Sequence, residues 1–130
     1  MTSRRIKVLR LTVGLGLVVS PAACGGTSQG TTTNTVPASP DLTVYGKDIK
    51  FDQTEYSAKA GTVNLAYISQ GNQTHNLIIE DSAGNKVGTK LAVGPGSKTG
   101  EVLTLTAGTY KMYCDIPGHK QSMNSVLIVS

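Results

Sequence analysis

The chain of 130 residues is long enough for one small domain, and it holds twelve Lys and Arg against eight Asp and Glu. Four of these basic residues lie in the first ten positions, so the rest of the chain carries equal numbers of acidic and basic side chains. The excess of positive charge therefore lies at the N-terminus. The rest of the chain is balanced in charge, so its charge gives no argument for a nucleic-acid partner.

Residues 1–23 have the pattern of an export signal peptide. A basic start is followed by the apolar run LTVGLGLVV and then by small residues that lead to Cys24. The apolar run is shorter than the roughly 20 residues that a membrane-spanning helix needs. The position of Cys24 resembles that of the acylated cysteine in a bacterial lipobox, which predicts a lipid anchor. Cleavage nearby, after Ala22 or Ala23, would instead give a freely secreted protein.

Residues 24–40 are rich in Gly, Ser, Thr and Pro, and they predict a flexible tether in front of a domain at 41–130. This arrangement places the domain outside the cytoplasmic membrane, in the periplasm or on the outer face of that membrane. Cys114 is the only cysteine of the domain, so no internal disulfide is expected there. Its thiol is either an inert core group or a reactive or metal-binding group.

The domain is predicted to consist of short strands separated by Gly-containing turns. No segment keeps a helical period long enough to predict a helix. The predicted strands cover 41–51, 55–61, 62–70, 75–81, two strands of 101–114 about a turn at Ala107-Gly108, and 125–130, with 94–100 predicted as a loop. This pattern indicates an all-β protein, a Greek-key β-sandwich or barrel with little or no helix.

Two residues suited to metal binding are expected on the inner face of this sandwich, at strand ends. Side chains alternate across a strand, so Cys114 shares its face with Met112. Tyr113 and Asp115 should point the other way, toward solvent. His75 begins a strand whose alternate residues are apolar, so we expect it to face inward as well.

Cys114 is followed by His119 and then by Met123, all within ten positions. Taken alone, an inward Cys is most often a small core residue, a Met fills the core, and a His in a loop is solvated. Together with His75 they form a set of two imidazoles, one thiolate and one thioether. This is the ligand set of a type 1 copper site, in which soft sulfur ligands favour Cu(I) and imidazoles suit both oxidation states.

The segments THN (74–76) and YCDIPGHKQSM (113–123) resemble the ligand segments of cupredoxins, the type 1 blue-copper family that includes azurins and plastocyanins. The resemblance extends over 41–130, and the spacings in the second segment resemble the azurin ligand loop. It implies one copper ion held by His75, Cys114, His119 and an axial Met123. It further implies that the backbone N–H of Asn76 donates to the cysteine sulfur and tunes the potential.

The function implied by the resemblance is one-electron transfer, with redox proteins as donor and acceptor. We expect a monomer, which would contact the membrane through the lipid anchor predicted at Cys24. An enzyme is not expected, because copper oxidases need further histidines and both histidines of this chain are already used. A copper storage or delivery protein without redox partners is the alternative. A metal-free sandwich for adhesion or ligand binding would leave the four-residue pattern unexplained.

Overall fold

The computed structural model describes residues 34–130, and the export signal of 1–23 and Cys24 lie outside the described residues. The described part is built from strands alone. They are β1 (Leu42–Lys47), β2 (Lys50–Phe51), β3 (Glu55–Ala58), β4 (Gly61–Ser69), β5 (His75–Glu80), β6 (Lys86–Val93), β7 (Lys98–Leu105), β8 (Gly108–Tyr113) and β9 (Asn124–Val129). Within 34–130 there is no helix that could cross a membrane.

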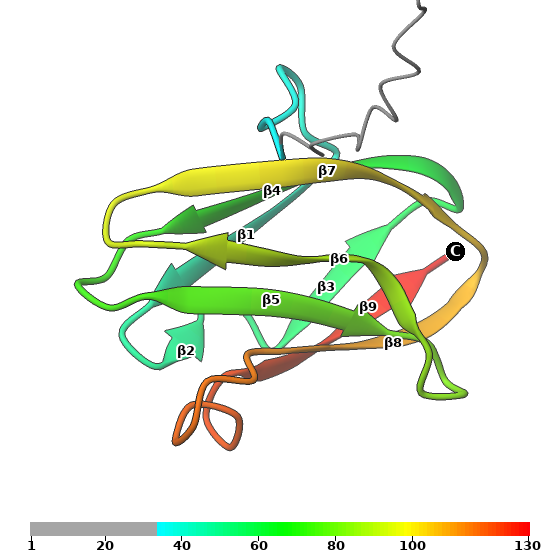
Figure 1. The fold of residues 1–130 in the computed structure, drawn as a ribbon. Helices are drawn as coiled ribbons and strands as arrows, with labels where there is room; N and C mark the ends of the chain where they lie inside the picture. Colours follow the sequence, from blue (N-terminus) through cyan, green and yellow to red (C-terminus); the bar gives the residue numbers. More distant parts are fainter. Residues whose placement is uncertain (1–33) are drawn as a thin grey trace, which may run out of the picture. The chain divides into compact units, whose positions relative to one another are not determined.

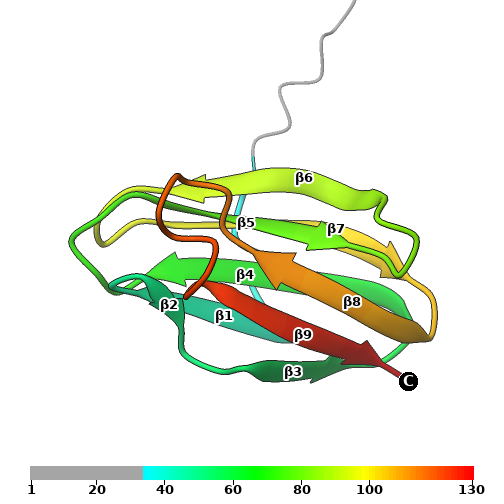
Figure 2. The ribbon, with the colours of Figure 1, turned by 90° about the horizontal axis from the view of Figure 1, so that it is seen from below.

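The strands form two sheets that lie face to face (Figures 1 and 2). One sheet has the order β2-β1-β4-β7, and the other has the order β3-β9-β8-β5-β6. Most neighbours are antiparallel, but β1 runs parallel to β4 and β3 runs parallel to β9. Parallel neighbours cannot be joined by a tight hairpin, so the chain crosses between the sheets. The all-β sandwich expected from the sequence is confirmed.

The core lies between the two sheets and follows the predicted alternation. In β4 the inward residues Val63, Leu65 and Tyr67 are at most 1% exposed. Met112 in β8 and Cys114, the residue that follows this strand, are fully buried in the same cluster. Burial of these side chains stabilises a domain whose only cysteine is a free thiol.

The strand β6 was not predicted at all, and two of the predicted strand boundaries were wrong. The loop predicted at 94–100 is shorter, because β7 already begins at Lys98 and its first residues pair with β4. The Gly and Ser content favoured a loop, but pairing with a long neighbouring strand overrides such local preferences. The strand predicted at 41–51 is interrupted at Asp48, whose φ of 51° is left-handed and separates β1 from β2. Asp is one of the few residues that adopt this conformation readily.

Tyr113 also departs from expectation, because it is 8% exposed although it points away from the core. Its hydroxyl donates to the Glu80 carboxylate, and the Lys120 ammonium lies 4.6 Å from the ring centroid. These neighbours come from β5 and from the β8–β9 loop, so alternation along β8 alone could not show that they cover the ring.

The last residues of the predicted tether contact β7, an edge strand. The Thr99 hydroxyl donates to the Asn34 carbonyl at 3.0 Å. Gly100 leaves room for this segment, since a Cβ there would lie 2.7 Å from Pro37 Cδ and 2.4 Å from the Leu65 carbonyl oxygen. Residues 34–37 thus cover part of an edge that would otherwise be open to pairing with another chain.

Candidate metal centre

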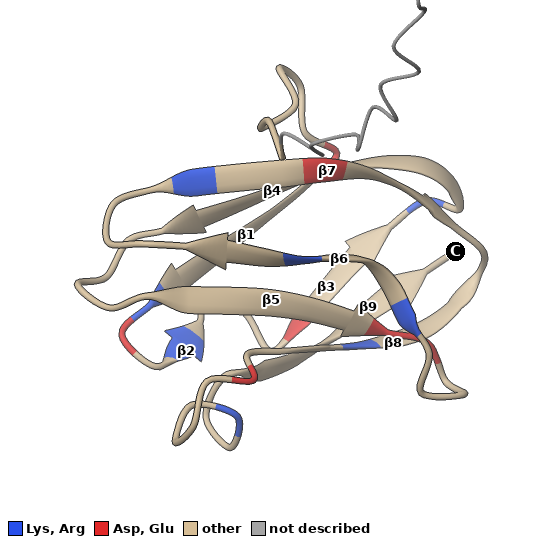
Figure 3. Cartoon of the chain, in the orientation of Figure 1, with Lys and Arg blue, Asp and Glu red and all other residues tan. Residues whose placement is uncertain are grey.

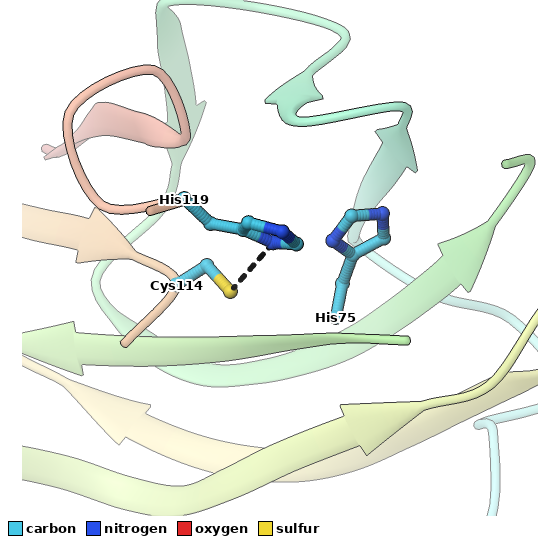
Figure 4. Close-up of side chains that lie close together, drawn as sticks. All are labelled: His75, Cys114 and His119. Atoms are coloured by element: carbon cyan, nitrogen blue, oxygen red, sulfur yellow. Dashed lines mark hydrogen bonds between the residues drawn. The ribbon is translucent and has the colours of Figure 1, made fainter. Parts of the chain in front are cut away.

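His75, Cys114 and His119 come together at one end of the sandwich. One ligand atom from each lies within 4.8 Å of the others. The Cys114 Sγ is 4.0 Å from His119 Nδ1, and the centroids of the two imidazole rings are 5.1 Å apart. Figure 4 shows the three side chains close together, with His75 coming from β5 and with Cys114 and His119 coming from the loop that follows β8. The sequence prediction of one shared site for these residues agrees with this geometry.

Sheet pairing explains why residues almost forty positions apart meet. The antiparallel pairing of β5 with β8 sets Ile78 opposite Tyr113, so the start of β5 lies beside the end of β8. His75 is the first residue of β5, and Cys114 directly follows β8. Figures 1 and 2 both place the β8–β9 loop at this end of the sandwich.

Backbone hydrogen bonds close the β8–β9 loop on itself. The His119 N–H donates to the Ile116 carbonyl at 2.9 Å, in a turn where Gly118 adopts a φ of 84°. The Met123 N–H donates to the His119 carbonyl at 2.8 Å, and the Cys114 N–H donates to the Met123 carbonyl at 3.1 Å. The loop therefore holds its ligand candidates in place before any ion binds.

The two histidines differ in exposure. His75 is fully buried, and neither of its ring nitrogens has a hydrogen-bond partner among the described residues. Burial, together with the nearby His119, lowers the pKa of His75 below its ordinary value of 6.5. This keeps the imidazole neutral, which is the form that binds a metal. His119 is only partly buried and is the more accessible of the pair.

Asn76 connects β5 to the β8–β9 loop. Its backbone N–H points at the Cys114 Sγ at 3.5 Å. Its side-chain amide donates to Asp115 Oδ1 at 2.7 Å and accepts from the Asp115 N–H at 2.9 Å. The Lys90 ammonium on the same carboxylate, followed by the Asn76 amide, lowers the pKa of Asp115 below its ordinary value. The contact expected of the Asn76 backbone N–H is thus present. Its effect on a reduction potential stays a prediction.

Met123 is fully buried in the core cluster beside these residues. A Cβ on Gly46 would lie 3.2 Å from the Met123 methyl carbon and 2.9 Å from the Tyr67 hydroxyl oxygen. The end of the thioether side chain therefore lies close to β1. Its role as an axial ligand stays a prediction.

The model of one protein family matches residues 38–130, and this family is described as copper-binding proteins of the plastocyanin/azurin type. The match covers more than half of the chain. The chain belongs to this family of cupredoxins. No match was found among curated protein sequences.

Solved structures show the same fold as this cupredoxin. An azurin, Az-iso2 from Methylomonas sp. strain J, has a TM-score of 0.61 at 19% identity, covering 72% of this chain and 99% of the azurin. Auracyanin A, a "blue" copper protein from Chloroflexus aurantiacus, has a TM-score of 0.56 at 22% identity, covering 71% of this chain and all of its own. A purple cupredoxin from Nitrosopumilus maritimus has a TM-score of 0.53 at 19% identity, covering 69% of this chain and 100% of the purple cupredoxin.

Copper is the cofactor of this family, and the chemistry of the donors fits it. The thiol of Cys114 is a soft ligand, and the imidazoles of His75 and His119 suit both copper oxidation states. The burial of His75 also fits a metal ligand, because a buried imidazole that no residue of 34–130 hydrogen-bonds is costly unless something else binds it. The three residues form a candidate copper site typical of a cupredoxin.

Sequence reasoning missed two residues beside the site of this cupredoxin. Tyr67 faces inward in β4, but alternation along a strand says nothing about its hydroxyl, which is buried without a hydrogen-bond partner among residues 34–130. Burial, with the neighbouring Cys114, raises the pKa of Tyr67 above its ordinary value. Lys90 was not singled out, because a lysine on a strand gives no signal of a partner 25 positions away.

Proposed function

We propose that this cupredoxin is an electron-transfer protein that works outside the cytoplasmic membrane, exchanging single electrons with a donor and an acceptor protein. The observation that carries the proposal is the buried imidazole of His75. Its two nitrogens have no hydrogen-bond partner in the described part of the chain, and one of them lies within 4.8 Å of one thiol and of a second imidazole. When bound, copper supplies the couple between Cu(II) and Cu(I).

The surrounding residues suit such a role because they resist rearrangement. His75 and Cys114 sit in a close-packed core, and the hydrogen-bonded loop fixes His119 and Met123. A fixed ligand geometry that suits neither oxidation state perfectly lets an electron pass with little movement. The chain thus contributes rigidity and exclusion of water.

His119 is the route that we propose for the electron. It is the more exposed imidazole, and Ile116, Pro117 and Gly118 precede it in the loop. These residues would form part of the surface on which a redox partner docks. Acidic and basic residues are interspersed over the strands seen in Figure 3, so we propose that contact around His119, and no extended charged face, selects the partner.

We infer that the protein is not an enzyme. A copper oxidase needs a second copper centre, and the two histidines of the chain are both assigned to this one. Cys114 is also fully buried, so its thiol does not face solvent where a substrate would approach.

Spectroscopy of the purified protein loaded with Cu(II) tests the copper site. We expect an intense blue thiolate-to-copper absorption band, a narrow hyperfine splitting in the EPR spectrum, and fast reversible voltammetry. Cys114→Ser should abolish the blue band. A colourless protein, or a blue band that survives in Cys114→Ser, would overturn the assignment. Slow or irreversible voltammetry of a blue protein would favour copper storage or delivery.

The axial role of Met123 has a matched control in Met112, since both methionines are fully buried. Met123→Leu should raise the reduction potential and keep the blue band, because loss of the weak thioether ligand destabilises Cu(II). Met112→Leu should leave the potential unchanged. Equal potentials in the two variants would remove Met123 from the ligand set.

The proposed membrane attachment depends on Cys24. Mass spectrometry of the exported protein should find a diacylglyceryl group on this cysteine, and Cys24→Ser should release the protein from the membrane fraction. A free N-terminus at a neighbouring residue in the wild-type protein would instead mean that the protein is secreted without an anchor.

A further inference from the structure

A series of four contacts connects a surface lysine to the thiol of the copper site. The Lys90 ammonium lies 2.5 Å from Asp115 Oδ2. The other carboxylate oxygen, Oδ1, accepts from the Asn76 side-chain amide at 2.7 Å, and the Asp115 N–H donates to Asn76 Oδ1 at 2.9 Å. The Asn76 backbone N–H then points at the Cys114 Sγ at 3.5 Å. Each carboxylate oxygen has its own donor, so the carboxylate is fixed in orientation.

We propose that Lys90 is a positioning residue of the copper site: it fixes the Asp115 carboxylate, which holds the Asn76 N–H against the Cys114 sulfur. The inference rests on the proposed copper-binding function. Lys90 has a second effect, because its positive charge offsets a carboxylate that directly follows the thiolate ligand in the chain.

The backbone of β6 is shaped so that Lys90 can reach this carboxylate. Leu77 of β5 pairs with Leu91, but Ile79 pairs with Val87, so three residues of β6 face the single residue between them on β5. Such a bulge changes the direction of the side chains that it carries, and bulges are frequent beside functional sites. Lys90 is the last residue of this bulge.

The bulge itself is fixed from the opposite sheet. The Thr89 N–H donates to both carboxylate oxygens of Glu101, at 3.0 and 3.1 Å. Gly88 adopts a φ of 70°, and a Cβ there would lie 2.5 Å from the same carboxylate. Glu101 therefore requires the glycine and holds the segment that presents Lys90. An accidental surface ion pair would not need such support.

The expected effect of losing the lysine has one sign. Without Lys90 the charge of Asp115 is no longer offset, and a negative charge stabilises the oxidised site, which is more positive by one unit, over the reduced site. A looser Asn76 N–H also stabilises the reduced, more electron-rich sulfur less well. Both effects lower the reduction potential.

The test compares Lys90→Met with Lys90→Arg and Lys86→Met. Arg at position 90 can keep the contact, whereas Lys86 lies near enough to Asp115 to act on it by charge and makes no hydrogen bond to it. In the copper-loaded protein we expect Lys90→Met to shift the ratio of reduced to oxidised protein at fixed potential by up to about tenfold, or about 59 mV. Lys86→Met should shift this ratio less, and Lys90→Arg should keep the wild-type reduction potential.

Hydrogen exchange of the Asn76 backbone amide in the metal-free protein gives a reading that needs no copper. Lys90→Met should speed this exchange up to about fivefold, because an exposed ion pair is worth up to about 1 kcal/mol, and Lys86→Met should leave it unchanged. Equal potentials and equal exchange in the two Met variants of a blue protein would overturn the inference. A wild-type protein that forms no blue site would overturn the proposed function, while faster exchange in Lys90→Met alone would still support the positioning contact.

Discussion

Two regions of the domain treat their buried polar groups in opposite ways. From the end of β4 to the start of β5, Tyr67, Ser69 and His75 bury side-chain polar atoms that have no hydrogen-bond partner. No other residue described at 34–130 does so. At the β7–β8 turn, by contrast, the Tyr110 hydroxyl donates to the Thr106 carbonyl at 2.9 Å.

This difference shows which buried polar groups lower the free energy of unfolding. A buried polar group without a partner costs about 1–3 kcal/mol, whereas a satisfied one stabilises by about 1 kcal/mol. The unsatisfied atoms of His75 belong to the candidate copper site, and Tyr67 lies directly beside it. The unpaired polar groups beside the candidate copper site thus lower the stability of the domain. The hydrogen bond of Tyr110 at the β7–β8 turn raises it.

Copper binding should remove the part of this difference that His75 contributes, and it has the largest expected effect. A ligand at a thousand times its Kd stabilises the folded state by about 4.1 kcal/mol, provided that it does not bind the unfolded chain. Denaturant unfolding with and without copper measures the gain. Cys114→Ser should lose most of it, and an equal gain in that variant would mean that the ion binds elsewhere.

His75→Leu should stabilise the metal-free domain by about 1–3 kcal/mol, because it replaces an unsatisfied imidazole by an apolar side chain of similar size. The variant should no longer form the blue site. His119→Leu is the matched control, and it should stabilise less, since His119 is already partly exposed to water. A metal-free His75→Leu domain that is less stable than wild type would contradict this account.

The pH dependence of the metal-free domain should change in the same variant. The folded-state pKa of His75 lies below 6.5, so the unfolded chain binds more protons as the pH falls. This histidine therefore leaves stability intact above pH 6.5 and lowers it progressively below, down to its folded pKa. His75→Leu should unfold with a weaker dependence on pH in that window.

Part of the site could be read from the sequence because the rules that place it are local. Alternation along β8 set Cys114 inward, and the short spacing to His119 keeps both in one loop. The meeting with His75 needed only that two strand ends lie at the same end of a sandwich.

The remaining features depend on contacts between distant segments. Lys90 reaches its partner through a bulge held by Glu101, and bulges have no reliable sequence pattern of their own. Whether the Tyr67 hydroxyl finds a partner depends on its neighbours in three dimensions, chiefly Gly46 of β1. The register of β7 was likewise set by its partner strand.

Gly46→Ala should destabilise the metal-free domain by about 1–3 kcal/mol, the usual cost of overpacking a core. The new methyl group would lie 2.9 Å from the Tyr67 hydroxyl oxygen, and Tyr67→Phe in the same chain should restore part of the loss. Gly94→Ala is the control, because only the Ser97 hydroxyl, at 3.8 Å, lies near its new methyl group. Equal losses in the two alanine variants would contradict a special constraint beside the copper site.

The smallest expected effect compares the two regions most directly, since it makes the same change in both. Tyr110→Phe removes a satisfied hydroxyl and should lower the free energy of unfolding by about 1 kcal/mol. Tyr67→Phe removes a hydroxyl that is buried without a partner, so it should leave that free energy unchanged or raise it by up to about 1 kcal/mol. Denaturant unfolding of both metal-free variants measures the difference. A loss in Tyr67→Phe as large as that in Tyr110→Phe would mean that the Tyr67 hydroxyl has a partner after all, and that its burial beside Cys114 costs the fold nothing.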